Sequence, residues 1–392
     1  MIRVIKTFVY FFYIFFPLKK KRILFHGYNG RPSGNSLAVF NYLEQDTFFR
    51  GKLFWASAKE DKNLDNGREI TIIPLRNSSF FSHVKFLFFL LTFKIIVCES
   101  AGDLSFYLRF LPKQIKKILL HHGMPIKSVG INAPHLNEKQ KKVWQSMGDK
   151  FDIFSVSCEL EKNIIRNGLN VPLEKIKIIG SQRKELVRYS DLEMNNSREL
   201  INKNFNLNID QSAKIIFYTP THRDHSNTLN RPNLFGFKNL EELDNFLVLS
   251  NSFLLIREHS VQTLNDFKKN FSNIALERQD IYTDFHLYAS CTNFLITDYS
   301  GIFLEFLASK MKIGFWQYDI NEYRKKRGFC LPESIFNIGT KIENEEDFYG
   351  FINNQEKEEI VDRERKFWER ELFKLSKEES LRSSKKEIIC LL

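Results

Sequence analysis

The chain has 392 residues, of which 43% are hydrophobic, enough for two ordinary domains with separate cores. The formal net charge of +11 favours an anionic partner such as a phosphorylated substrate, an acidic lipid or nucleic acid. The five cysteines are widely spaced and form no CxxC pair, which argues against a disulfide framework or a zinc site and is typical of a reducing cytosol.

Residues 1–22 combine an aromatic stretch, VIKTFVYFFYIFFPL at 4–18, with the cations of Lys19–Arg22. The stretch is too short to span a bilayer as a helix, and it lacks the cleavage site of a signal peptide. Aromatic side chains followed by cations are typical of a segment in the membrane interface that faces anionic lipid. The alternative is a first core element. We predict a membrane-associating segment and a peripheral location on the cytoplasmic face of the cell membrane.

Short apolar runs alternate with helical patterns through the first half of the chain. The polar, Asn-rich segment 187–211 predicts a domain junction, so the first domain is placed at residues 23–195. The runs predict strands at 22–28, 52–57, 70–74, 94–98, 117–120, 153–157 and 176–179, and helices at 36–45, 81–93 and 158–167.

The second half, residues 196–392, repeats the alternation and ends in a charged helical stretch at 356–385. Alternation of strands and helices in both halves predicts an α/β fold with two doubly wound, Rossmann-like domains. The predicted strands are 214–218, 253–257, 293–297 and 312–316, with helices at 261–270 and 302–310.

The strand at 293–297 ends in the small polar residues of Asp298, Tyr299, Ser300 and Gly301 before a helical pattern. Free backbone N–H groups at such a turn form a cradle for an anion, and open α/β sheets bind ligands at this edge. The segment therefore predicts a site for a nucleotide diphosphate. The alternative is an ordinary loop capped by Ser300.

Three further loops after predicted strands carry chemically suggestive side chains. In the first, at 121–127 (HHGMPIK), a histidine on a stiff turn is suited to deprotonate a hydroxyl. In the second, at 218–224 (YTPTHRD), Arg223 is suited to bidentate phosphate binding. In the third, Arg257 and His259 alternate on one face and would stabilise a diphosphate leaving group. The alternatives are structural histidines, a helix cap with a surface ion pair, and a solvated strand edge.

The chemistry predicted from these loops requires no metal and no cofactor. They contain no DxD pair and no Cys/His cluster, and cationic side chains are able to neutralise phosphate in place of a metal. The sequence also lacks a P-loop, a GxGxxG and a GxSxG motif.

Taken together, these segments resemble the CDP-glycerol glycerophosphotransferase family of teichoic-acid and capsule synthesis. The family patterns W-H-G-T-P-L-K, Y-A-P-T-W-R-D and R-x-H-P resemble 121–127, 218–224 and 257–260. T-D-Y-S-S and Y-D-x-x-x-Y resemble 297–301 and 318–323. G-x-P-R-N-D is matched only in part at 180–185, and the segment 23–43 resembles the first βα unit, with Asn35 at a matching asparagine. Departures from the family are Met124, Ser260 and Gly301, in place of Thr, Pro and Ser.

The resemblance implies two Rossmann-like domains facing each other across a cleft, the GT-B arrangement. It implies transfer of a polyol phosphate, which we expect to be glycerol phosphate, from a CDP-activated donor to a lipid-linked glycan or growing polymer, with release of CMP. The cytidine follows from the resemblance alone. By the same analogy His122 is the base on the acceptor hydroxyl, and His259 with Arg257 stabilises charge on the donor. Donor-binding residues would be Thr221, Arg223, Asp298, Ser300, Gly301 and Asp319, and acceptor-side residues Asn35, Gly123, Pro125 and Lys127.

Two other functions remain open from the sequence. The first is a nucleotide-sugar glycosyltransferase on the same fold, with Glu305 or Asp319 as its sugar-binding carboxylate. The second is a non-catalytic protein that binds nucleic acid or lipid through its basic charge, which predicts exposed aromatics interleaved with Lys and Arg. Because most Phe residues fall in apolar runs, we expect no nucleic-acid partner.

Overall fold

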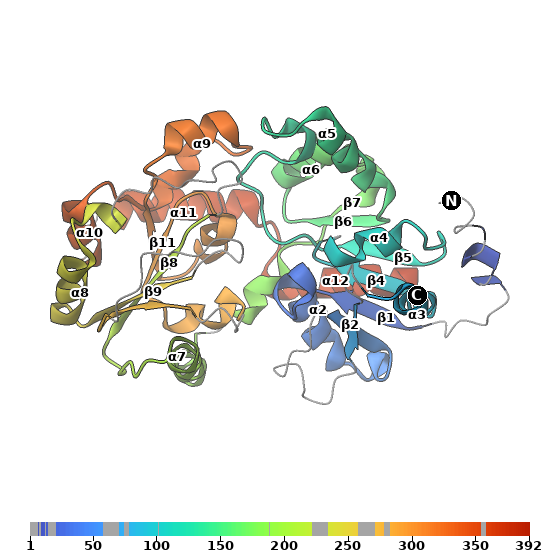
Figure 1. Ribbon diagram of the computed structural model, residues 1–392, viewed down its shortest axis with the longest axis horizontal. Helices are drawn as coiled ribbons and strands as arrows, with labels where there is room; N and C mark the ends of the chain where they lie inside the picture. The colour runs from blue at the N-terminus through green and yellow to red at the C-terminus, as the bar shows by residue number, and fades with distance from the viewer. Residues whose placement is uncertain are drawn as a thin grey trace. The chain divides into compact units, whose positions relative to one another are not determined.

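The computed structural model divides the chain into two compact units, each of which contains one parallel sheet (Figure 1). Unit 1 comprises 1–122, 137–186 and 372–392, and unit 2 comprises 123–136 and 187–371. The sequence placed a single boundary between 195 and 196, whereas these units interleave along the chain. The structure describes residues 7, 9–11, 13–14, 21–57, 70–73, 78–100, 102–187, 189–221, 234–257, 271–277, 283–353 and 358–392.

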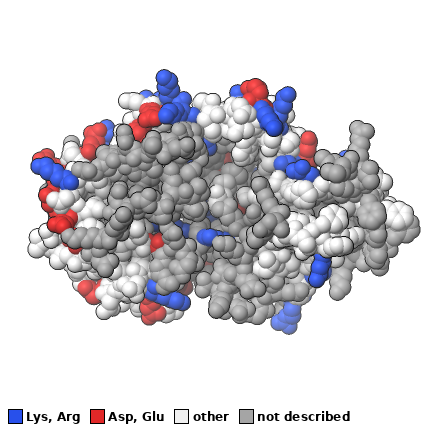
Figure 2. All heavy atoms as spheres, viewed as in Figure 1, with Lys and Arg blue, Asp and Glu red and all other residues white. Residues whose placement is uncertain are grey.

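The surface carries many ion pairs between neighbouring side chains. On the face drawn in Figure 2, the described Lys and Arg side chains are scattered, and several of them lie beside Asp or Glu side chains. Lys141 pairs with Glu138 at 3.0 Å, and Arg324 pairs with Glu333. On the described part of this face, the basic side chains therefore do not form a single positive patch.

The sheet of unit 1 has seven parallel strands in the order β3-β2-β1-β4-β5-β6-β7. Its strands are apolar runs because both faces of a parallel sheet are buried. The order reverses between β1 and β4, which makes their carboxyl ends a topological switch point. The strands are β1 (Ile23–His26), β2 (Leu53–Ser57), β3 (Ile70–Ile72), β4 (Ile95–Cys98), β5 (Lys116–Leu119), β6 (Ile153–Val156) and β7 (Ile176–Ile178).

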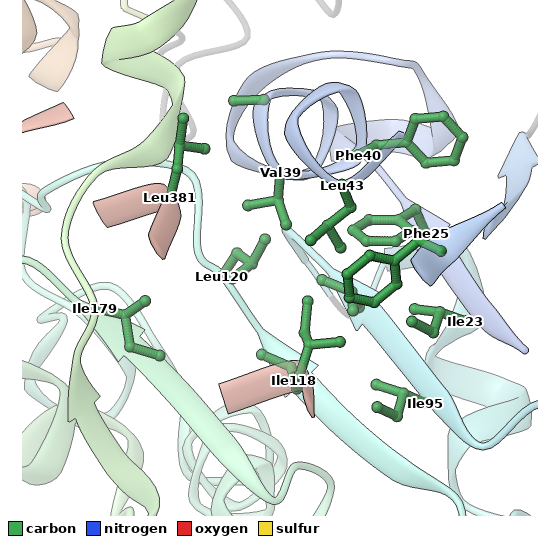
Figure 3. Packing of buried hydrophobic residues seen from close by; sticks show 14 of the residues in the cluster. Ile23, Phe25, Val39, Phe40, Leu43, Ile95, Ile118, Leu120, Ile179 and Leu381 are labelled. Atoms are coloured by element: carbon green, nitrogen blue, oxygen red, sulfur yellow. The ribbon is translucent and has the colours of Figure 1, made fainter. Parts of the chain in front are cut away.

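Helices α2 and α12 pack together over the core of this sheet. Figure 3 shows Leu381, from the end of the chain, beside Val39 and Leu120 in the same apolar cluster. This packing explains why residues 372–392 belong to unit 1. The helices of unit 1 are α2 (Gly34–Glu44), α3 (Phe80–Leu90), α4 (Ser105–Leu108), α5 (Glu138–Gln145), α6 (Glu159–Leu169) and α12 (Lys377–Leu391), with 3-10 helices that include η1 (Tyr28–Gly30) and η8 (Gln182–Leu186).

The sheet of unit 2 has six parallel strands in the order β10-β9-β8-β11-β12-β13, with a switch point between β8 and β11. The strands are β8 (Lys214–Thr219), β9 (Ser252–Ile256), β10 (Ile274–Leu276), β11 (Phe294–Thr297), β12 (Lys312–Phe315) and β13 (Thr340–Lys341). The helices are α7 (Asp191–Phe205), α8 (Leu240–Leu249), α9 (Ile320–Lys326), α10 (Glu345–Ile352) and α11 (Glu358–Leu372), with the 3-10 helix η12 (Gly301–Phe306). The two parallel sheets confirm the predicted α/β class.

Three predicted segments differ from the structure. The Asn-rich junction at 187–211 contains helix α7, which Ser190 caps and which buries Ile201 and Phe205. The segment after Ser300 begins as a 3-10 helix rather than an α-helix. The charged tail forms two helices. Helix α11 belongs to unit 2 except for its last residue, Leu372, and α12 belongs to unit 1. The predicted helix at 261–270 lies outside the described residues.

The described part of the N-terminal segment exposes Tyr10, Phe11 and Ile14 and buries Val9. Arg22, predicted to face lipid, instead lies over aromatic rings, 3.8 Å from the centroid of Phe54. Guanidinium groups favour such stacking, so this cation contributes to packing. Among the described residues, no helix is long and apolar enough to cross a membrane.

Candidate functional site

The carboxyl ends of β1, β4 and β5 meet at one edge of unit 1. Cys98 lies in register with both His26 and Leu119, so the residues that follow each strand emerge side by side. These residues are the η1 turn after β1, Glu99 after β4 and, after β5, the turn that carries His121 and the predicted base His122. The register therefore places the His121-His122 turn next to the switch point of this sheet.

His122, the predicted base, lies in a row of rings. Its ring centroid is 5.0 Å from that of Tyr28 and 4.8 Å from that of His121. His121 has a φ of 61°, a left-handed conformation that costs about 1–2 kcal/mol for a residue with a side chain. Its ring nitrogen lies 3.8 Å from Glu161, which also accepts hydrogen bonds from the N–H and hydroxyl of Ser157. Strain held by such contacts is common at active sites.

Asn35, a predicted acceptor-side residue, ties this turn to its surroundings. Its side-chain amide donates to the carbonyl of His121 at 2.8 Å and to that of Leu120 at 3.3 Å. Its side-chain oxygen accepts from the backbone N–H of Arg183 at 2.9 Å. The partly matched family segment at 180–185 is thus joined to the histidine turn through one side chain.

The other three predicted acceptor-side residues, Gly123, Pro125 and Lys127, belong to unit 2. Lys127 forms an isolated antiparallel bridge with Phe329, and Cys330 donates its N–H to the carbonyl of Ile126 at 2.8 Å. The HHGMPIK segment therefore divides directly after His122. Nothing in the sequence marks this division, because both halves belong to one continuous motif.

In unit 2, the side chain of Asp298 forms hydrogen bonds to both loops that follow β8 and β11. It is fully buried, and its carboxylate accepts from the N–H of Thr221 at 2.9 Å and from that of Tyr299 at 2.5 Å. Its carbonyl accepts from the side chain of Gln317 at 3.1 Å. An anion in this place shapes the loop by binding backbone donors.

Ser300 and Gly301 lie at the start of η12 on the same edge. Ser300 accepts from the N–H of Ile302 at 3.4 Å. Gly301 packs so closely that an added Cβ would lie 2.8 Å from the carbonyl oxygen of Met124. The two departures from the family at Met124 and Gly301 are therefore in contact, which their separation in sequence does not reveal.

Two tyrosines support this loop. The Tyr299 hydroxyl donates to Asp319 at 2.8 Å, and its ring stacks on Tyr323 with centroids 3.9 Å apart. Asp319 is thereby brought to the loop that holds Ser300. Stacking adds to burial in fixing the position of the loop.

Arg257 directly follows β9 and lies 3.3 Å from Glu277, a carboxylate that also accepts from Tyr288 at 2.8 Å. The Arg257 side chain is 12% exposed, so burial and the ion pair both restrict its motion. The predicted partners Arg223 and His259 lie outside the described residues. The expected alternation of Arg257 and His259 therefore stays a prediction.

A buried charge cluster in unit 2 was not predicted. His286 binds Asp284 at 2.7 Å through one ring nitrogen and Glu305 through the other. Burial lowers the pKa of His286, but the two carboxylates outweigh it and raise the pKa to about 9. The sequence shows only that Asp284 and His286 are two residues apart, and it does not indicate their contact with Glu305. No group of three or more His, Cys, Asp or Glu in the described ranges is arranged to hold a metal ion.

Comparison with known proteins supplies the chemical context. The family model for CDP-glycerol:poly(glycerophosphate) glycerophosphotransferase matches residues 8–384. A teichoic acid poly(glycerol phosphate) polymerase of Bacillus spizizenii is 26% identical over 343 residues, 83% of each chain. A polymerase of the same name from Bacillus subtilis is 24% identical, over 80% of this chain and 41% of its own length. Among solved structures, a CDPG-soaked variant of the wall teichoic acid polymerase TagF has a TM-score of 0.73 at 20% identity, over 98% of this chain and 92% of its own.

Proposed function

Because this chain belongs to the CDP-glycerol:poly(glycerophosphate) glycerophosphotransferase family, we propose that it transfers glycerol phosphate from CDP-glycerol to a hydroxyl group. The acceptor is a lipid-linked glycan or a growing teichoic-acid-like or capsule-like polymer, and CMP is released. The observation that carries this proposal is the family match over 8–384. The motif residues that the structure describes add support, because most of them follow strands at the sheet switch points or next to them.

In the proposed reaction the acceptor oxygen attacks the phosphorus that carries the glycerol. A new phosphorus–oxygen bond forms while the bond to the CMP oxygen breaks, and the hydroxyl proton passes to His122. An imidazole titrates near neutral pH and is suited to accept this proton. The rings of Tyr28 and His121 limit the motion of His122, which favours one productive orientation.

The donor is proposed to bind the second half of the chain. Arg223, Arg257 and His259 would neutralise the diphosphate as CMP leaves. Thr221, Ser300 and Gly301 would present backbone N–H and hydroxyl groups to phosphate, with Asp298 shaping their loop and Asp319 fixing it through Tyr299. Asn35, Gly123, Pro125 and Lys127 are proposed on the acceptor side. The cleft between two facing domains stays a prediction.

The structure gives less support to a nucleotide-sugar glycosyltransferase. That function needs a carboxylate to bind sugar hydroxyls, and Glu305 and Asp319 were its candidates. Glu305 is buried and bound to His286, and Asp319 accepts from Tyr299. Both carboxylates already serve contacts within the protein.

We also propose peripheral association with anionic membranes, as predicted for residues 1–22. Exposed aromatic side chains support it: Tyr10 and Phe11 near the start of the chain, and Phe80 and Phe81 on α3, of which Phe81 is 81% exposed. Residues 78–98, around α3, include Lys85 and Lys94 but no Asp or Glu. Aromatic side chains beside cations suit the headgroup layer of anionic lipid.

The test of the proposed reaction is a donor panel. Wild-type protein receives CDP-glycerol, CDP-ribitol or UDP-glucose with a lipid-linked disaccharide, and free CMP or UDP is measured. CMP release from CDP-glycerol that is lost in both His122→Ala and His259→Ala supports the assignment. UDP release with both CDP-polyols inert would replace it with the glycosyltransferase.

A further inference from the structure

Glu99 is a buried carboxylate at the switch point of unit 1, directly after β4. Its side chain accepts hydrogen bonds from two backbone N–H groups, that of Tyr28 at 3.1 Å and that of Asn35. The residue is only 1% exposed. Burying a carboxylate is costly unless its oxygens are bonded, so this residue is tied to the turns it binds.

The carboxylate lies against the N-terminus of α2. Gly34 has a φ of 60°, and a Cβ there would lie 2.0 Å from a Glu99 oxygen. Helix N-termini attract anions, and here an internal anion binds the N–H of Asn35 in the first turn. The N-terminus of α2 therefore binds the carboxylate of Glu99 rather than a substrate phosphate.

Both residues that Glu99 holds reach the histidine turn. Tyr28 places its ring 5.0 Å from that of His122. Asn35 donates to the carbonyl oxygens of Leu120 and His121, the residues that precede His122. One buried side chain thus fixes the ring beside the proposed base and the backbone that carries it.

We propose that Glu99 is a positioning residue for His122, acting through Tyr28 and Asn35. This inference rests on the proposed function, since it presumes that His122 takes the acceptor proton. Glu99 has no role in proton transfer itself. It keeps the imidazole in the orientation that meets the hydroxyl, and small losses of such alignment are costly to a reaction rate.

The experiment compares Glu99→Gln with Asp152→Asn in the full-length protein. Glutamine keeps the shape but puts an NH2 group where one oxygen accepted a backbone N–H. Asp152 is the matched control, because its carboxylate also accepts a hydrogen bond from a backbone N–H, that of Lys117 at 2.9 Å. This contact lies at the start of β5, whereas the His121-His122 turn follows the end of that strand. We expect kcat with CDP-glycerol to fall about 100-fold in Glu99→Gln, with KM for CDP-glycerol within about twofold. Asp152→Asn should keep both constants.

A double-mutant cycle separates positioning from general damage. If Glu99 acts through the imidazole, Glu99→Gln costs nothing further in a His122→Ala background. A full additional loss there, or a kcat for Glu99→Gln near that of wild type, would overturn the inference. Tyr28→Ala keeps the backbone N–H and removes the ring, so it should lower kcat about tenfold even if Glu99→Gln fails to fold. A Tyr28→Ala kcat near that of wild type would also overturn it.

Amide hydrogen exchange tests the network without any substrate. Exchange in peptides covering 27–36 should accelerate in Glu99→Gln and stay unchanged in Asp152→Asn, because Tyr28 and Asn35 lose their acceptor. If the wild-type protein is inert toward CDP-glycerol, the proposed function is wrong, but hydrogen exchange still tests the contacts that Glu99 makes. Unchanged exchange at 27–36 in Glu99→Gln would overturn the network itself.

Discussion

Gly301→Ala is the substitution whose effect follows most directly from the geometry. The added Cβ would lie 2.8 Å from the carbonyl oxygen of Met124, whereas ordinary contact begins at 3.4 Å. Because that atom belongs to the backbone, it cannot be relieved by turning a side chain. The 124–127 segment must move away from η12 by about 0.6 Å, the separation needed to restore van der Waals contact.

Overpacking of this kind costs about 1–3 kcal/mol. For a unit of this size, about 2 kcal/mol corresponds to a fall in Tm of roughly 4–8 °C. The displaced segment carries Pro125 and Lys127, so we expect kcat/KM for CMP release to fall about tenfold.

Calorimetry and the CMP assay on the same preparations measure the two effects. Gly51→Ala is the control: its φ is 70° and nothing lies within 4 Å of the added Cβ, so it introduces strain without a clash. It should lower Tm slightly and leave CMP release unchanged. A Gly301→Ala protein with wild-type Tm and kcat/KM would refute the close approach of Met124, and with it the coupling of the two family departures.

Three further predictions follow from other contacts. The folded pKa of His286 is raised to about 9, so the stability that its charge contributes is present below its unfolded pKa and is lost as the pH rises through 9. The free energy of unfolding, measured with urea, should therefore fall by on the order of 2 kcal/mol between pH 7 and 10. This pH dependence should be smaller in Glu305→Gln. Arg22→Ala should lower Tm by a few degrees through lost stacking but leave binding to anionic vesicles at the wild-type level, and a large loss of binding would contradict its place over Phe rings. Tyr299→Phe removes a hydrogen bond to Asp319 worth about 1 kcal/mol, so KM for CDP-glycerol should rise several-fold while kcat holds; a fall in kcat alone would contradict it.

The sequence predicted most of the strands because parallel strands, buried on both faces, are continuous apolar runs such as Ile95–Cys98. It missed β10 and β13, which have only three and two residues. It failed for α7, whose buried face includes Ser197, Arg198 and Asn204 beside two apolar residues. Arg198 is buried because it donates to the carbonyl of Asp210 at 2.6 Å, a contact that composition cannot reveal.

The loops of the candidate site were predicted because each follows a strand, and within each sheet the register places neighbouring loops side by side. Glu99 was missed because its partners Tyr28 and Asn35 lie 71 and 64 residues away, with no local pattern to connect them. The same holds for the packing of 372–392 on unit 1, which depends on contacts between α12 and α2. Long-range hydrogen bonds and helix packing are settled only in three dimensions.

The most direct test of the account is the mass spectrum of a lipid-linked acceptor after incubation with CDP-glycerol. The account predicts products heavier by whole glycerol phosphate units with the wild-type protein, and unmodified acceptor with His122→Ala. Acceptor left unmodified by the wild-type protein, or full product from His122→Ala, would contradict it.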